Sequence, residues 1–131
     1  MATKNDVLQR LASEYAAAWS SGDPAAVAEF YAADGQISIN RGETLTGTQA
    51  ITEMAAGFHG EFPDLEIRCD LMRCAGRHAV FVWTLEGHHA QTKNHVVVGG
   101  WEEWELDGDL KVSKSLGWFD EEEYQRQIAG G

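Results

Sequence analysis

Glu102 is the residue of this chain whose type and position most favour chemistry. It lies in a segment where apolar and acidic residues alternate, and it falls on the apolar face with Trp104 and Leu106. A carboxylate among apolar side chains is desolvated, which raises its pKa toward values useful for proton transfer. We therefore interpret Glu102 as a candidate general acid or base. Two alternatives stay open: a place at the mouth of a pocket, or a bulge at Gly99 and Gly100 that turns Glu102 outward.

Asp120 and His89 are two further titratable candidates. Asp120 directly precedes a predicted helix, and Glu123 completes a D-x-x-E pattern, so the competing interpretation of Asp120 is a helix cap. By strand alternation His89 shares a face with Phe81 and Trp83, which points it at a pocket rim, where it could move a proton near neutral pH. The alternative for His89 is a loop histidine in solvent.

Large aromatic residues are numerous for so small a domain and form the candidate ligand-binding set. A pocket lined by aromatic side chains with few polar groups suits a planar, apolar small molecule, whereas the alternative is simple core packing. The sequence contains no glycine-rich phosphate loop, nucleophile elbow or nicotinamide fingerprint, and its histidines lack metal-ligand spacing. We therefore expect neither a cofactor nor a metal. The aromatic set comprises Trp19, Phe30, Phe58, Phe81, Trp83, Trp104 and Trp118.

The elements that must position these residues can be followed along the chain. Apolar residues repeat at helical spacing up to Trp19, and Asp23 with Pro24 opens a second short helix. A short hairpin over residues 36–46 leads to a third helix, for which Thr48 is the expected N-cap. From residue 65 the period changes to two, and the predicted strands and closing helix cover 65–74, 79–87, 95–106, 110–119 and 120–128.

Length and composition bound the remaining classes. A chain of 131 residues with 44% hydrophobic content is the size of one compact domain, so we expect a single domain over residues 1–131. A formal net charge of -11 with scattered Lys and Arg argues against nucleic acid and anionic membranes as partners. No apolar run approaches the roughly 20 residues of a membrane span, and no leader pattern follows Met1, so we expect a cytoplasmic protein.

The faces of two strands carry further expectations. Cys69 and Cys74 are five residues apart, so alternation sends their side chains to opposite faces, forbids a local disulfide and predicts free thiols. Leu71 is expected on the apolar face with Cys69. Trp101 is a large aromatic on the charged face of its strand, which is typical of a subunit interface. We therefore expect a homodimer through the outer face of the sheet.

The helix pair in Y-A-A-A-W-S-S-G-D-P-A-A-V-A-E-F-Y-A-A-D-G, followed by long alternating strands, resembles the opening of the nuclear transport factor 2-like superfamily. The resemblance covers nearly the whole chain and implies an α+β fold, a cystatin-like roll. Its order is α-α-β-β-α-β-β-β-β plus a short C-terminal helix, and a cone-shaped, curved antiparallel sheet wraps around the N-terminal helices. Members of this superfamily include isomerases, cyclases, dehydratases and non-catalytic binding modules, so the resemblance specifies fold better than reaction.

Resemblance to two branches, ketosteroid isomerases and SnoaL-like polyketide cyclases, implies roles for individual residues. The stretch V-V-G-G-W-E-E-W-E-L places Glu102 nearest to the isomerase acid that donates to an oxyanion. Tyr15 lies where the isomerases have a tyrosine that donates to the substrate oxygen, although a core tyrosine is the alternative. The isomerase base is missing, because Asn40 ends a first strand without a carboxylate. The ending S-L-G-W-F-D-E-E-E-Y resembles that of the cyclases, which implies Asp120 as the base.

These observations lead to one expectation and one rival. We expect an enzyme of the SnoaL-like or ketosteroid isomerase-like type, which performs cofactor-independent proton abstraction, isomerisation or cyclisation on an apolar carbonyl compound. The rival is a non-catalytic small-ligand-binding or interaction module of the same fold. The expected catalytic residues are Glu102, Asp120, Tyr15 and His89, the last by resemblance to dehydratase histidines, and the expected ligand-binding residues are Trp19, Asn40, Phe58, Phe81, Trp83, Trp104 and Trp118.

Overall fold

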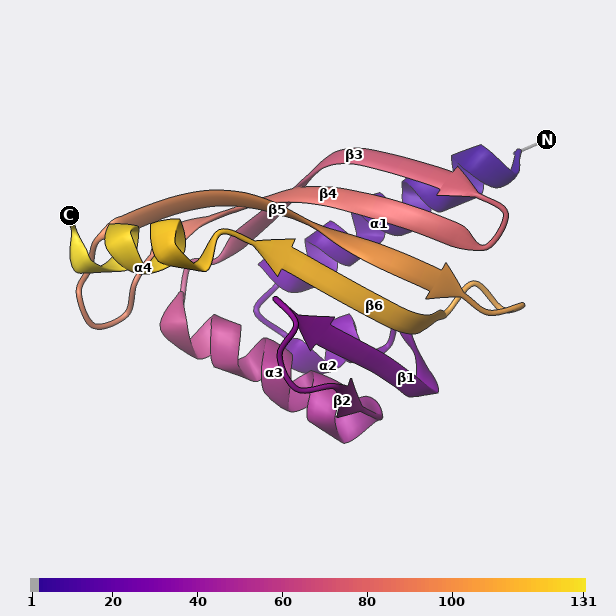
Figure 1. Cartoon of the computed structure of the whole chain (residues 1–131), viewed down its shortest axis with the longest axis horizontal. Helices are drawn as coiled ribbons and strands as arrows, with labels where there is room; N and C mark the ends of the chain where they lie inside the picture. The colour runs from indigo at the N-terminus through magenta and orange to yellow at the C-terminus, as the bar shows by residue number, and fades with distance from the viewer. Residues whose placement is uncertain (1–2) are drawn as a thin grey trace.

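The computed structural model describes residues 3–131, and its elements follow the predicted α+β order. The resulting roll confirms the predicted fold class (Figure 1). The helices are α1 (Lys4–Ser20), α2 (Pro24–Ala28), α3 (Thr48–Glu61) and α4 (Glu121–Ala129). The strands are β1 (Tyr31–Ile39), β2 (Leu45–Thr46), β3 (Glu66–Ala75), β4 (His78–His88), β5 (His95–Leu106) and β6 (Val112–Phe119).

Local capping chemistry sets where the helices begin. Asp23 accepts a hydrogen bond from the N–H of Ala25 at 3.0 Å, and Pro24 occupies the first position of α2, as the sequence predicts. The prediction that Thr48 caps α3 is wrong, because Gly47 is the N-cap and Thr48 is already helical. Gly47 has a φ of 92°, a conformation that a residue with a side chain rarely adopts. Within residues 3–131, no helix combines the length and apolar character that crossing a membrane requires.

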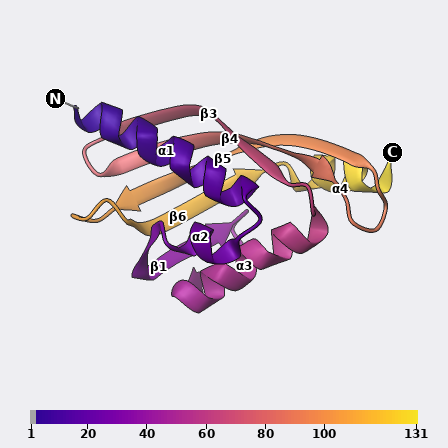
Figure 2. The same cartoon turned by 180° about the vertical axis from the view of Figure 1, so that it is seen from behind.

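The sheet has the strand order β2-β1-β6-β5-β4-β3 and bends along its long strands (Figure 1). Neighbouring strands are antiparallel except β1 and β6, which run parallel, so the sheet is mixed rather than wholly antiparallel. Helices α1, α2 and α3 lie on one side of this sheet (Figure 2). α4 packs at the end of β5, where Gln127 exchanges two hydrogen bonds with the backbone of Val97. The inner face is therefore covered and the outer face is left open.

The predicted bulge at Gly99 and Gly100 is absent from the β4–β5 ladder. Gly99 pairs with Thr84 and Gly100 with Trp83 in unbroken register, and burial alternates along the whole of β5. Position 100 requires glycine for a steric reason, because a Cβ there would lie 2.5 Å from the Trp83 indole and 2.4 Å from the carbonyl oxygen of Trp118. The prediction of a bulge was wrong, and the glycine instead makes room for a tryptophan ring.

A register shift does occur in β3, between Cys69 and Leu71. The extra residue reverses the alternation, so Leu71 is 41% exposed while the next residue, Met72, is buried. Cys69 and Cys74 consequently both pack against the core, and the prediction that they lie on opposite faces was wrong. Both are free thiols, as expected, and burial raises the pKa of the Cys69 thiol.

Three aromatic side chains join α1 to the middle of the sheet. The rings of Phe81 and Trp104 stack with centroids 5.3 Å apart, and the Tyr15 ring meets both edge-on at 5.2 and 5.1 Å. All three are buried. Packing of this kind is worth about 0.5–1.5 kcal/mol per aromatic pair beyond the buried area. Tyr15 is therefore held at a defined position above β4 and β5.

Candidate functional site

Glu102 lies in the centre of the sheet and faces inward. In β5 it pairs with Phe81 of β4 on one side and with Gly117 of β6 on the other. Because β5 has no register shift before Glu105, the alternation read from the sequence holds and keeps Glu102 on the apolar side. Its exposed fraction is 7%, which makes it one of three buried polar or charged residues among those the structure describes.

Four donors surround the Glu102 carboxyl group. Its Oε1 accepts hydrogen bonds from the Ser115 hydroxyl at 2.8 Å, the Trp104 indole N–H at 2.9 Å and the Tyr31 hydroxyl at 3.1 Å. The Tyr15 hydroxyl lies 3.1 Å from both carboxyl oxygens. Oε1 is thus crowded with donors, whereas Oε2 has Tyr15 alone. Oε2 is the carboxyl oxygen with capacity left for a ligand.

The two tyrosine hydroxyls and the carboxyl group form a closed triangle. The hydroxyl oxygens of Tyr15 and Tyr31 are 2.9 Å apart, and each also contacts Glu102. Three contacts need three protons, but two phenols supply only two when Glu102 is ionised. A protonated Glu102 supplies the third. The proton count therefore favours the neutral acid in this arrangement.

Burial acts in the same direction as the proton count. Desolvation raises the pKa of Glu102 above its usual range, although hydrogen bonds from Trp104, Ser115 and the two tyrosines oppose that rise. Burial and the nearby carboxyl group also hold the pKa values of Tyr15 and Tyr31 well above 10, so both phenols remain protonated donors. The site is a buried carboxyl group fixed by donors that do not themselves ionise.

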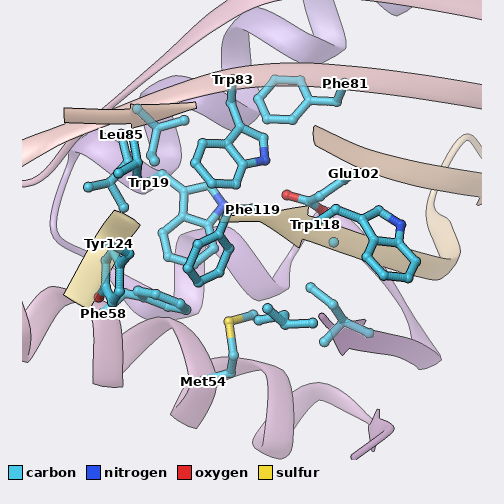
Figure 3. Close-up of a pocket in the computed structure, with 15 residues that line it drawn as sticks. Trp19, Met54, Phe58, Phe81, Trp83, Leu85, Glu102, Trp118, Phe119 and Tyr124 are labelled. Carbon is cyan, nitrogen blue, oxygen red and sulfur yellow. The ribbon is translucent and has the colours of Figure 1, made fainter. Parts of the chain in front are cut away.

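A narrow apolar cavity lies beside Glu102 (Figure 3). Its volume open to the centre of a water molecule is about 50 Å³, whereas a single water needs about 10–15 Å³. The cavity therefore suits a small ligand. Among its described lining residues, Glu102 is the only carboxyl group. The lining comprises Trp19, Ile37, Ile39, Met54, Phe58, Ile67, Phe81, Trp83, Leu85, Val98, Glu102, Gly117, Trp118, Phe119 and Tyr124.

The cavity lining contains most of the expected aromatic residues, but not all of the expected ligand-binding residues. Trp19, Phe58, Phe81 and Trp83 line it, and Figure 3 labels all four among the side chains of its wall. Trp118 lies at the border, with the Arg41 guanidinium 5.6 Å from its ring centroid.

Trp104 and Tyr15 lie outside the lining, where both donate hydrogen bonds to the Glu102 carboxyl group and pack on the lining residue Phe81. Asn40 also lies outside the lining. Its Oδ1 accepts the N–H of Phe119 at 2.9 Å, which ties β1 to the end of β6.

Asp120 and His89 also lie outside the cavity lining. Asp120 is exposed and accepts a hydrogen bond from the N–H of Glu123 at 3.1 Å. It therefore caps α4, as the helix-cap interpretation predicts. His89 is buried rather than in solvent, because its ring packs on Phe62 with centroids 5.5 Å apart. Across residues 3–131, no three His, Cys, Asp or Glu side chains gather in an arrangement that could hold a metal ion.

Tyr31, Ser115 and Gly117 are site residues that sequence reasoning missed. Ser115 and Gly117 alternate on the inner face of β6, so the strand period could have placed them beside Glu102. Tyr31 gave no comparable signal, because the sequence predicts strand β1 only from residue 36 and leaves Tyr31 outside it. Its contact with Glu102 joins residues 71 positions apart and depends on the parallel β1–β6 pairing.

The chain thus folds as an α+β roll with a narrow apolar cavity and a buried carboxyl group in the cavity lining. The chain matches the SnoaL-like domain family over residues 12–113 and belongs to it. No curated protein matches the chain in sequence.

Solved structures with the same fold are similar at low identity. A protein with a ketosteroid isomerase-like fold from Catenulispora acidiphila, solved in complex with trimethylamine, has a TM-score of 0.81 at 20% identity, over 88% of this chain and 89% of that chain. TsrD from Streptomyces laurentii has a TM-score of 0.83 at 17% identity, over 100% of both chains. A candidate SnoaL-like polyketide cyclase from Shewanella denitrificans has a TM-score of 0.77 at 16% identity, over 95% of this chain and 98% of that chain. At these identities the likeness establishes the fold.

Proposed function

We propose that this protein is a cofactor-independent enzyme that moves a proton on a small apolar carbonyl compound, in an isomerisation or cyclisation. The observation that carries the proposal is the position of Glu102, a buried carboxyl group in the lining of an otherwise apolar cavity. Membership of the SnoaL-like family supports the general class of reaction. A ligand-binding neighbour of the same fold, solved with trimethylamine, supports a small ligand.

The simplest reaction uses Glu102 twice. The ionised carboxylate takes a proton from the carbon next to a carbonyl group and leaves an enolate, and the neutral acid then returns that proton to a different carbon. The double bond moves and the carboxylate is regenerated. A raised pKa makes Glu102 a stronger base once it is ionised and brings its titration nearer to neutral pH. Tyr15, Tyr31, Trp104 and Ser115 hold the carboxyl group in place and are positioning residues.

A small probe suited to the cavity tests this reaction. We expect wild-type protein to convert 3-cyclohexenone into 2-cyclohexenone, followed by the absorbance of the conjugated product, with a rate that rises with pH through the pKa of Glu102. Glu102→Gln should abolish the conversion. Glu53→Gln is the matched control, because Glu53 is exposed on α3 and lies outside the cavity lining. Equal rates for wild type and Glu102→Gln would contradict a catalytic role for this carboxyl group.

The second candidate function is a non-catalytic small-ligand-binding module. The observation that favours it is Asn40, which stands at the end of β1 without a carboxylate and binds the backbone of Phe119 instead of facing the cavity. If the protein binds 3-cyclohexenone but does not convert it at any pH, the result would favour the non-catalytic binding module.

We also propose that two copies of the chain associate through the outer face of the sheet. Leu71, Val82 and Trp101 pair in turn across β3, β4 and β5 and form one apolar row. Trp101 is 43% exposed, and its indole N–H binds Glu103 on the same face. A row that crosses the centre of the sheet can meet its own copy about a two-fold axis, which is how most homodimers form. The second copy is therefore the occupant that we propose for this face.

A further inference from the structure

A second hollow adjoins the inner cavity and shares part of its wall. Ile39, Phe58, Phe119 and Tyr124 line both spaces. The outer hollow, of about 500 Å³, is open to solvent and adds polar residues to this shared wall. These polar residues are Asn40, Glu61, Glu121 and Gln125. A molecule that fills the inner cavity has this polar space directly next to it.

Glu61 is the residue of the outer hollow whose position is best defined. It ends α3, and its Oε2 accepts the hydroxyl proton of Tyr124 at 3.0 Å. The backbone carbonyl of Glu61 accepts the N–H of Ala90 at 2.7 Å, which anchors the end of the helix. Its side chain is still 47% exposed, so the carboxylate is fixed by a hydrogen bond and remains accessible to a ligand.

The buried imidazole of His89 lies next to the Glu61 carboxylate. Its Nδ1 accepts the N–H groups of Gln91 and Thr92, both at 3.3 Å, so the proton of a neutral imidazole is on Nε2. Nε2 lies 3.8 Å from Oε1 of Glu61. His89, which the sequence singled out for chemistry, is thus a buried neighbour of Glu61.

Proton counting indicates what the outer hollow can bind. The only hydroxyl proton of Tyr124 is donated to Glu61, so the phenol oxygen has only acceptor capacity left. Burial and the neighbouring carboxylate raise the pKa of Tyr124, so it stays protonated. Glu61 itself is acceptor-only when ionised. Both groups therefore call for a ligand that brings hydrogen-bond donors.

We propose that the ligand has two parts: an apolar part that fills the inner cavity beside Glu102, and a protonated amine that binds Glu61 in the outer hollow. Glu61 is then a specificity-determining residue, which accepts an ammonium group and repels a carboxylate or phosphate. The net charge of -11 acts in the same direction. The inference deepens the proposed function by naming a substrate class, and it rests on that function only for its use of the same inner cavity.

Three probes with the same phenyl ring test this inference in the intact chain. They are 2-phenylethylamine, 2-phenylethanol and phenylacetate, which carry an ammonium group, a hydroxyl group and a carboxylate. Isothermal titration calorimetry gives their affinities for wild type, Glu61→Gln and Glu53→Gln. Glu53 is the matched control, since it is exposed on α3 and lines neither space. Circular dichroism establishes that each variant is folded.

We expect wild type to bind the amine about tenfold more tightly than the alcohol, because a hydrogen bond between two charged groups is stronger than one between a neutral hydroxyl and a carboxylate. Phenylacetate should bind weakest. Glu61→Gln should lose the preference for the amine, whereas Glu53→Gln should keep it. Equal affinity for the three probes, no binding of any probe, or an amine preference that survives in Glu61→Gln would overturn the inference.

The test separates this inference from the proposed reaction. Glu102→Gln removes the proposed chemistry but leaves Glu61 and the outer hollow unchanged, so it should keep the preference for the amine over the alcohol. A protein that prefers the amine but converts no ketone would retain the two-part site and lose the enzyme proposal. A protein that converts the ketone but does not prefer the amine would retain the enzyme proposal and lose the two-part site.

Discussion

Glu102 and Gly117 stand opposite each other on β5 and β6, and the missing side chain of Gly117 leaves the space beside the carboxyl group open. A Cβ at position 117 would lie 3.8 Å from Cγ of Glu102 and 3.6 Å from Ile39, which is ordinary contact. The backbone there does not require glycine, since no positive φ is found at Gly117. Space for a ligand, rather than backbone conformation, is therefore what this glycine provides.

Gly117→Val should close the cavity while keeping the fold. We expect the affinity for 2-phenylethylamine to fall about tenfold or more, because the valine side chain would occupy space that the ligand needs beside Glu102. Isothermal titration calorimetry measures the affinity, and thermal unfolding checks the fold. A folded variant with unchanged affinity would place the binding site elsewhere.

Glu102→Gln should change how stability depends on pH. Because burial raises the folded pKa of Glu102, the neutral form stabilises the folded state, and this stabilisation is complete below the unfolded pKa of about 4.3. Wild type should lose stability relative to Glu102→Gln as pH rises from that value through the folded pKa. Urea unfolding of both proteins across this range measures the difference, and parallel curves would show that Glu102 has no raised pKa.

Gly100→Ala should destabilise the protein strongly, whereas Gly99→Ala should not. A Cβ at Gly100 would lie 2.4 Å from a carbonyl oxygen and 2.5 Å from Trp83, while one at Gly99 would be 3.6 Å from its nearest neighbour. We expect Gly100→Ala to lower the free energy of unfolding by about 1–3 kcal/mol through overpacking. Chemical unfolding of the two variants measures it. Equal stability of the two would mean that Trp83 moves away at little cost.

Trp101→Glu should disrupt the proposed homodimer. A carboxylate in the apolar row would be desolvated and would face a second copy of itself across the two-fold axis. Sedimentation at micromolar concentration should give a dimer for wild type and a monomer for the variant. Lys93→Glu serves as a charge control, because Lys93 lies in the exposed loop after His89, away from the outer row. A monomeric wild-type protein would contradict the proposed homodimer.

Sequence patterns were sufficient for the element order, and they favoured an inward direction of Glu102 without excluding an outward one. Both follow from local periodicity: helical spacing up to Trp19, period two from residue 65, and strict alternation through β5. The cap at Asp23 was also readable, because capping depends on residues within one turn. The same local logic explains Asp120, whose D-x-x-E pattern is a helix cap in the structure.

Tertiary structure decided what surrounds Glu102 and where the alternation breaks. The bulge after Cys69 comes from pairing with β4, and Gly100 is required by a ring on a neighbouring strand, so neither is encoded by a short segment alone. The triangle of Tyr15, Tyr31 and Glu102 joins residues up to 87 positions apart. Local sequence determines which face a side chain takes, because backbone geometry has a fixed period. Its partners depend on which distant strands pair and on how side chains fill the space between them, and this is settled only when the whole chain folds.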